Sequence, residues 1–162
     1  MEGLWFREVE QGRRFLIKIA PGESLQRRLV EFAHAAGVTY AVVLSAVGSV
    51  QDVKFRGIKT GAKLPITAPR VHVHEVQGPL ELLGLTGNLF PDEKGELDSH
   101  LHVLASRSSG EVLGGHLFDA TVFATCELVL SEIRAEGVER HLSKTGGIHT
   151  VFIGPDDPRH DR

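Results

Sequence analysis

"SHLHVLASRSSGEVLGGHL", residues 99–117, contains two runs of sequence separated by a short polar turn. The run 99–107 alternates polar and apolar side chains, SSGE (108–111) follows it, and the run 112–118 comes next. Alternation with a period of two predicts β-strands, and the short turn between them predicts an antiparallel hairpin. Gly114 and Gly115 in the second run predict a β-bulge.

The hairpin carries three histidines that could share one metal ion. Side chains two apart on a strand point to the same face, so His100 and His102 lie on one face about 6.6 Å apart, while Leu101 points to the other face. The turn returns His116 beside them. Three neutral nitrogen donors without a thiolate are typical of catalytic zinc with an open position, although imidazole also suits iron, nickel and copper. The alternative is three solvated histidines on a strand surface.

Other candidate residues are less well supported by their neighbours. His72 and His74 form a second alternating pair, but no third ligand is near in the sequence, and their role is open. Glu81 shares a strand face with Leu83 and Leu85 and could act as an acid or base if that face is buried. A carboxylate at a strand edge is the alternative. The sequence identifies no other catalytic residue, and two further histidines are expected to be solvated, His141 and His149.

The rest of the chain predicts one helix and several more strands. Residues 21–37 place Leu25, Leu29, Phe32 and Ala36 on one helical stripe, with Gly22 or Ser24 at the start and Gly37 at the stop. Cys126 alternates with apolar residues, so we expect a buried core thiol. The expected strands cover 4–9, 13–20, 40–50, 50–58, 70–76, 78–90 and 121–133. Together these predict an α+β fold with a strongly bent, mostly antiparallel sheet or sandwich and one main helix.

Length and composition restrict the class of protein. The 162 residues fit a single domain over 1–153, followed by a polar, proline-containing tail over 154–162 that we expect to be disordered. One cysteine excludes an internal disulfide, and no apolar run approaches the ~20 residues of a membrane span. The first residues resemble no targeting signal, so we expect a cytoplasmic protein without a membrane partner.

A local excess of positive charge stands out against the net charge of −3. No acidic residue occurs between Val53 and His74. This stretch is either a solvated loop or a contact for an anion such as DNA, and the candidate contacts are Lys54, Arg56, Lys59, Lys63 and Arg70.

Over about residues 13–133 the chain resembles the plant-and-prokaryote-conserved (PPC) domain family. The landmarks occur in order: PGESLQRRLVEFAHAAGV, AVVLSAVGSV, VQGPLELLGLTGNL, SHLHVLASRSSGEVLGGHL and ATVFATCELVL. The resemblance implies a fold like that of acetolactate decarboxylase and a homotrimer assembled through its sheets. It also implies that His100, His102 and His116 are the ligands of a divalent metal, for which zinc is favoured.

The resemblance leaves two classes of function open. The family is described as DNA-binding because plant members join this domain to an AT-hook, an R-G-R-P element, and no R-G-R-P occurs in this chain. One hypothesis is therefore a trimeric regulatory domain of the DNA-binding type, in which the metal is structural. The other is a metal-dependent enzyme, a lyase or hydrolase, that acts on a small oxygenated substrate.

Overall fold

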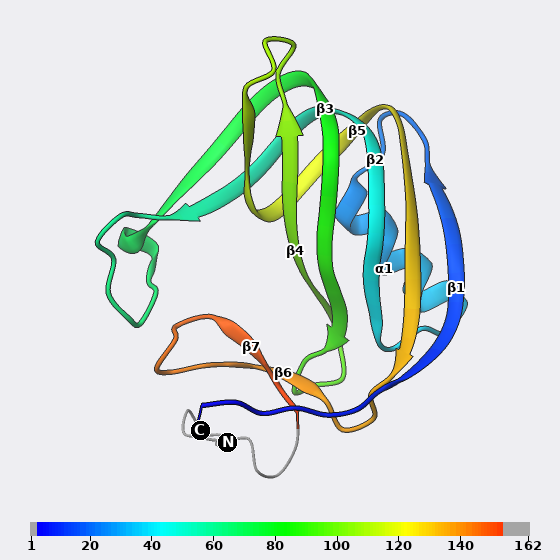
Figure 1. Cartoon of the computed structure of the whole chain (residues 1–162), viewed down its shortest axis with the longest axis vertical. Helices are drawn as coiled ribbons and strands as arrows, with labels where there is room; N and C mark the ends of the chain where they lie inside the picture. Colours follow the sequence, from blue (N-terminus) through cyan, green and yellow to red (C-terminus); the bar gives the residue numbers. More distant parts are fainter. Residues whose placement is uncertain (1–2, 154–162) are drawn as a thin grey trace.

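Long strands that bend along their length make up most of the protein (Figure 1). The computed structural model describes residues 3–153, so the tail expected over 154–162 lies outside the described residues. The elements in chain order are β1 (Glu10–Ile19), α1 (Leu25–Ala36), β2 (Ala41–Ile58), the 3₁₀ helix η1 (Ala68–Arg70), β3 (Val71–Pro91), β4 (Leu97–Ser106), β5 (Val112–Arg134), β6 (Glu139–Leu142) and β7 (His149–Phe152).

Five of these strands form one antiparallel sheet that closes on itself. The order is β1-β5-β2-β3-β4, and β4 also pairs with the first residues of β5. The strands β2, β3, β4 and β5 therefore enclose a continuous core, while β6 and β7 form a separate hairpin. The α+β class, the strong bend and the antiparallel pairing predicted from the sequence are all confirmed.

The strand boundaries differ from the prediction in a consistent way. The expected pairs 40–50 and 50–58, 70–76 and 78–90, and 112–118 and 121–133 are each one continuous strand: β2, β3 and β5. Register shifts occur inside them, for example between Val50 and Asp52 in the pairing of β2 with β3. A bulge lets a strand bend and twist without losing its partner, so a local break in the alternation does not end the strand.

The expected strand over 4–9 is wrong. Within residues 3–153, β1 is the first strand, and it begins inside the expected turn EQG (10–12). Glu10 and Gln11 extend it because they pair with Arg134 and Ile133 of β5. A strand needs a hydrogen-bonding partner as well as alternation, and among the described residues 4–9 have no partner strand.

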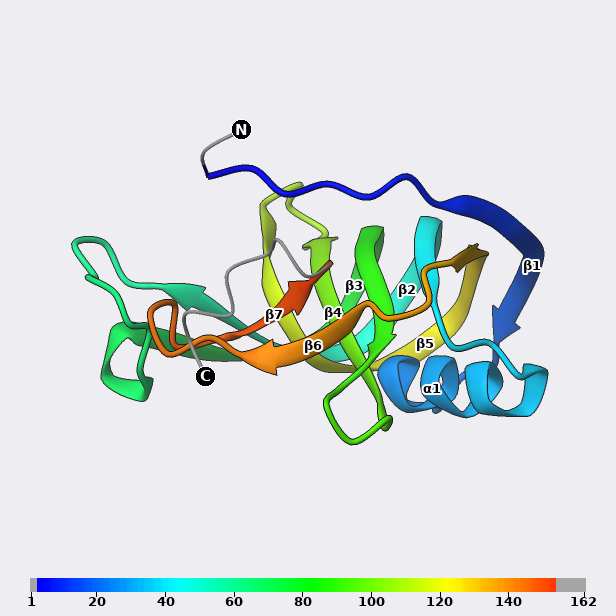
Figure 2. The same cartoon turned by 90° about the horizontal axis from the view of Figure 1, so that it is seen from below.

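The helix α1 forms as expected and covers one face of the sheet (Figure 2). Ser24 is the N-cap and accepts a hydrogen bond from the Arg27 N–H, and Gly37 ends the helix with φ 63°. Leu25, Leu29 and Ala33 are buried in the core. No helix within residues 3–153 is both long enough and apolar enough to cross a membrane.

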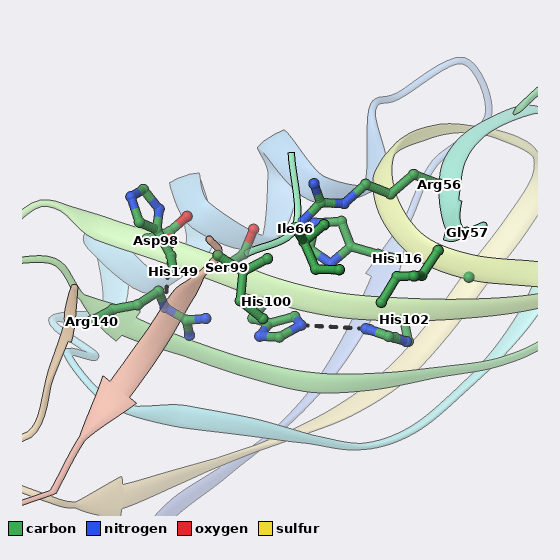
Figure 3. A pocket seen from close by; sticks show the side chains of 13 residues that line it. Arg56, Gly57, Ile66, Asp98, Ser99, His100, His102, His116, Arg140 and His149 are labelled. Atoms are coloured by element: carbon green, nitrogen blue, oxygen red, sulfur yellow. Dashed lines mark hydrogen bonds and ion pairs between the residues drawn. The ribbon is translucent and has the colours of Figure 1, made fainter. Parts of the chain in front are cut away.

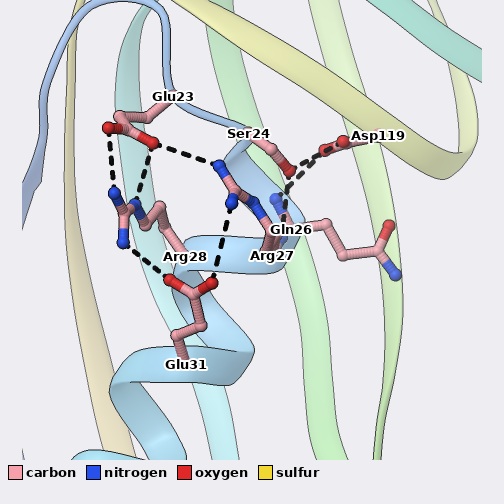
Figure 4. A network of polar contacts seen from close by, with 7 residues as sticks. All are labelled: Glu23, Ser24, Gln26, Arg27, Arg28, Glu31 and Asp119. Atoms are coloured by element: carbon pink, nitrogen blue, oxygen red, sulfur yellow. Dashed lines mark hydrogen bonds and ion pairs between the residues drawn. The ribbon is translucent and has the colours of Figure 1, made fainter.

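The start of α1 is attached to β5 and β4, and Figure 4 shows the contacts of Ser24 and Gln26 with Asp119 of β5. The Ser24 hydroxyl donates to Asp119 Oδ2 of β5 at 2.7 Å, and the backbone N–H of Gln26 donates to Oδ1 of the same carboxylate at 3.3 Å. The Gln26 side-chain amide donates to the Ser99 hydroxyl of β4 at 2.7 Å. Because Ser99 directly precedes His100, these bonds hold the histidine-bearing strand against the helix.

Candidate metal centre

The hairpin of β4 and β5 brings the three predicted histidines together. Leu101, Val103 and Ala105 of β4 are buried in the core, so His100 and His102 project from the opposite face. The pairing register places His102 directly opposite His116 of β5. The alternation and the antiparallel turn predicted from residues 99–117 are therefore both confirmed.

The two glycines before His116 act differently from the prediction. The β4–β5 register runs through Gly114 and Gly115 without a shift, so the bulge expected there is wrong. A Cβ atom on Gly114 would lie 2.1 Å from the Val103 carbonyl oxygen, and one on Gly115 would lie 2.4 Å from that of Arg56. At this point β5 is paired with β4 on one side and β2 on the other, and only glycine allows both backbones to come so close.

The imidazole nitrogens form a compact donor cluster. One ring nitrogen of each histidine lies within 4.8 Å of the others, and the Nε2 atoms of His100 and His102 are 3.3 Å apart. His102 is exposed, whereas His100 and His116 are half-buried. In the described part of the chain this is the one group of three or more metal-ligating side chains that converges in this way. The donor set fits a borderline divalent ion.

The surroundings lower the pKa of two of the three histidines. Burial, followed by the charge of Arg56, lowers the pKa of His116 to about 4. Burial, followed by the charge of Arg140, also lowers the pKa of His100. Metal binding requires the unprotonated imidazole, so at neutral pH these two side chains present free lone pairs.

A cavity of about 560 Å³ opens beside the histidines (Figure 3). It is enclosed by the end of β2, by β4 and β5, by the loop after β2 and by the β6–β7 hairpin. Its walls include, besides the three histidines, Arg56, Arg140, Asp98, Ile58, Ile66 and Ile148. The backbone N–H of Ile66 donates to the Gly146 carbonyl at 2.8 Å, which joins the loop to the hairpin over the cavity.

Arg140 is the main residue of the site that sequence reasoning missed. Its side chain is 2 % exposed, and it donates to Asn88 Oδ1 and lies 3.3 Å from Asp98 Oδ2 through its Nε. Asp98 precedes His100 by two positions, so strand alternation could have placed this carboxylate on the histidine face. Arg140 had no comparable signal, because β6 is only four residues long and was not predicted.

The structure separates the residues of the basic stretch. Arg56 lines the cavity, whereas Lys54 forms an ion pair with Glu75 Oε1 at 2.6 Å. Lys59 donates to the Pro69 carbonyl at 3.0 Å. Arg70 donates to the carbonyls of Lys63 and Pro65. Two of the five predicted anion contacts therefore hold their own loop in shape, and Arg56 is the one that joins the histidine site.

The remaining candidates lie outside the cluster. Glu81 is exposed and pairs in register with Ser106 at the far end of β4, and it does not line the cavity. The rings of His72 and His74 are 4.5 Å apart, and His74 stacks on Phe55; within residues 3–153 they have no third ligand.

The two histidines expected to be solvated differ from each other. The expectation is wrong for His141, whose side chain is 17 % exposed and packs edge-on against Phe152. Pairing of β6 with β7 brings these two rings together, and the sequence did not predict that hairpin. His149 is exposed, as expected, and borders the cavity.

Known proteins share this architecture. The profile of the Plants and Prokaryotes Conserved (PCC) domain matches residues 6–134. A solved structure of a metal-containing protein from Archaeoglobus fulgidus is 30% identical with a TM-score of 0.79, covering 92% of this chain and 99% of that one. Acetolactate decarboxylase from Bacillus subtilis subspecies spizizenii, 13% identical with a TM-score of 0.55 over 73% of this chain and 52% of that one, shares the fold alone.

Curated relatives contain the matched region as a small part of a longer chain. Bifunctional protein GlmU of Synechococcus sp. (strain JA-2-3B'a(2-13)) is 30% identical over 140 residues, which are 86% of this chain and 20% of that protein. AT-hook motif nuclear-localized protein 14 of Arabidopsis thaliana is 30% identical over 101 residues, 62% of this chain and 22% of that protein. This chain thus spans about a fifth of the length of these relatives.

Proposed function

The chain belongs to the Plants and Prokaryotes Conserved (PCC) domain family, and we propose that it is a metal-binding regulatory protein of that family. In this proposal His100, His102 and His116 hold one divalent cation, with zinc the favoured ion. The observation that carries the proposal is the convergence of three imidazole nitrogens within 4.8 Å beside an open cavity. In an enzyme, a bound ion would supply Lewis acidity at the cavity wall. In a regulatory protein without a substrate, it would hold β4 and β5 together.

Two further observations support a metal. The related chain from Archaeoglobus fulgidus is a metal-containing protein. Burial and Arg56 keep His116 unprotonated, which is the form that binds cations. Three imidazoles without a thiolate favour zinc, although the same donors suit iron, nickel and copper.

Elemental analysis of protein purified from metal-replete cells tests this proposal. We expect about one ion per chain in the wild type and loss of the ion in His100→Ala and His116→Ala. His34→Ala is the matched control, because His34 is exposed on α1 and away from the cluster. A wild-type protein without metal under these conditions contradicts the proposal.

The homotrimer belongs to the same proposal. Apolar side chains are exposed on the outer face of the sheet: Leu16, Leu44, Val47, Leu83 and Leu104. The β3–β4 register pairs Gly84 with Leu104, which brings Leu104 next to Leu83. A second copy of the same face would remove these side chains from water. Sedimentation equilibrium tests this proposal: we expect a trimer for the wild type and a smaller species for Leu83→Glu. A monomer for both proteins contradicts it.

DNA is the second partner that we propose. The plant relative is an AT-hook protein, but this chain has no R-G-R-P element. The candidate contacts are Lys54, Arg56, Lys59, Lys63 and Arg70. Lys54, Lys59 and Arg70 already form ion pairs or hydrogen bonds within the chain. Binding of DNA therefore depends on an oligomer that repeats this basic stretch. Electrophoretic titration across salt concentrations tests it, and no binding at low salt refutes it. The proposed location is the cytoplasm.

The cavity favours a second candidate function, a metal-dependent lyase or hydrolase acting on a small oxygenated substrate. Three protein donors, rather than four, converge at its wall in the described residues. Catalytic zinc sites keep a position free in this way, whereas structural sites are closed. Proton NMR of the metal-loaded protein with a panel of small oxo acids and esters tests it. Turnover that is lost in His116→Ala supports an enzyme, and no turnover across the panel favours the regulatory function.

A further inference from the structure

We propose that the cavity beside the three histidines binds a small organic carboxylate, held by Arg56 and Arg140 at its charged wall and by three isoleucines at its apolar wall. This inference rests on the proposed function in one respect: the ligand occupies the same cavity as the metal site. It adds the chemical class of the ligand and the residues that recognise it.

Arg56 supplies a positive charge without a counterion. The guanidinium of Arg56 lies 5.8 Å from the centre of the Phe118 ring, and no described carboxylate forms an ion pair with it. Its neighbour Lys54, two residues earlier on β2, is neutralised by Glu75. Arg56 is therefore the cation of this strand that is left to meet an anion inside the cavity (Figure 3).

Arg140 approaches the histidines from the other side. In Figure 3 it lies beyond His100, while Arg56 lies beside His116. Its charge acts on both histidines, as the charge of Arg56 does. The buried Nε atom of Arg140 has no hydrogen-bond acceptor among the described residues, although Asp98 lies 3.3 Å away. Arg140 therefore brings a second positive charge to the cavity wall, paired with Asp98, whereas Arg56 has no ion-pair partner among the described residues.

The apolar wall restricts the class of anion. Ile58, Ile66 and Ile148 face the cavity, and its volume of about 560 Å³ is in the range of small-molecule sites. An inorganic anion has no hydrocarbon to pack against these side chains. Asp98 at the wall also disfavours a dianion, because like charges repel in a partly desolvated site. A monocarboxylate with a short hydrocarbon chain satisfies both walls, and the guanidinium fork matches its two oxygens.

Calorimetric titration of the full-length wild-type protein tests the inference with 3-methylbutanoate as the probe. Its amide, 3-methylbutanamide, has the same shape without the charge, and inorganic phosphate has charge without hydrocarbon. We expect the acid to bind at least tenfold more tightly than the amide or phosphate. The metal content of each sample is measured in parallel.

Variants separate the roles of the two arginines. Arg56→Gln should weaken binding of the acid about tenfold or more, and the metal content of the same sample shows whether the ion is still bound when the acid is not. Arg140→Lys keeps the charge but removes the fork, and we expect a several-fold loss. Arg107→Gln is the matched control, because Arg107 pairs with Glu111 and does not line the cavity; its affinity should stay within about twofold. Arg56 is only half-buried, so the test stands even where the Arg140 variant fails to fold.

The outcomes distinguish this inference from the metal proposal. Equal binding of acid and amide, tighter binding of phosphate, or an unchanged affinity in Arg56→Gln overturns the carboxylate site even when the metal is present. Arginine-dependent binding of the acid by a protein without metal supports the carboxylate site and contradicts the metal proposal instead.

Discussion

Gly87 of β3 is the position where one added methyl group should disturb the metal centre most clearly. It has φ +135°, a conformation that residues with a side chain rarely adopt. A Cβ atom at this position would lie 1.9 Å from the His100 carbonyl oxygen and 3.0 Å from the Leu101 Cα. Both neighbours are backbone atoms of β4, so no side-chain rotation can relieve the contact.

The magnitude follows from the geometry. Ordinary contact begins near 3.4 Å, so β3 and β4 must separate by about 1.5 Å (3.4 − 1.9) at His100. The unfavourable backbone conformation costs about 1–3 kcal/mol, and forcing an extra methyl into a packed region costs a further 1–3 kcal/mol or so. Gly87→Ala should therefore lower the free energy of unfolding by roughly 2–6 kcal/mol. It should also reduce metal occupancy, because His100 moves with its strand.

Urea unfolding followed by circular dichroism, with elemental analysis of the same samples, measures both effects. Gly84→Ala is the matched control: it is the same substitution on the same strand, but its added Cβ would have no atom within 4 Å. We expect that variant to change the free energy of unfolding by less than about 1 kcal/mol. Equal stability and equal metal content in the two variants would refute the reasoning.

Three further predictions concern titratable groups. Cys126 is fully buried, and burial raises the pKa of its thiol to about 11. A thiol reagent at pH 8 should therefore label it only after unfolding. Rapid labelling of the native protein would contradict the burial of this thiol. The pKa of His116 falls from 6.5 to about 4 on folding, so the metal-free protein should lose stability as the pH falls from about 6.5 to 4. Urea unfolding at several pH values measures this loss, and His116→Gln should show a smaller dependence of the free energy of unfolding on pH. Hydrogen bonds from Arg13 hold the pKa of Glu132 at about 2. The stability that these bonds contribute should be present above pH 4.5 and disappear toward pH 2. Arg13→Gln should therefore be slightly less stable than the wild type at pH 7 and equally stable near pH 2.

The short-range features of this protein could be predicted from local sequence. The caps of α1, the buried stripe through Leu25 and Leu29, and the alternation of His100 and His102 all depend on residues within one or two turns of each other. The return of His116 could be predicted as well, because a short turn constrains the next strand to pair with the previous one.

The tertiary structure decided the features that depend on distant partners. Whether Glu10 belongs to a strand depends on Arg134, 124 residues away, and the continuity of β2, β3 and β5 depends on neighbours that keep their hydrogen bonds through the bulges. Arg140 reaches the site on a four-residue strand that is held in place by β7 and by Asp98.

The sequence by itself therefore determined the α+β class, the helix and the three histidines on one face, because periodicity and turn chemistry act over a few residues. Only the tertiary structure decided that Arg56 and Arg140 border those histidines and that Glu81 does not. The physical reason is that a cavity is formed by the closure of segments such as the loop at Ile66 and the hairpin at Ile148, and contacts between distant segments leave no local pattern.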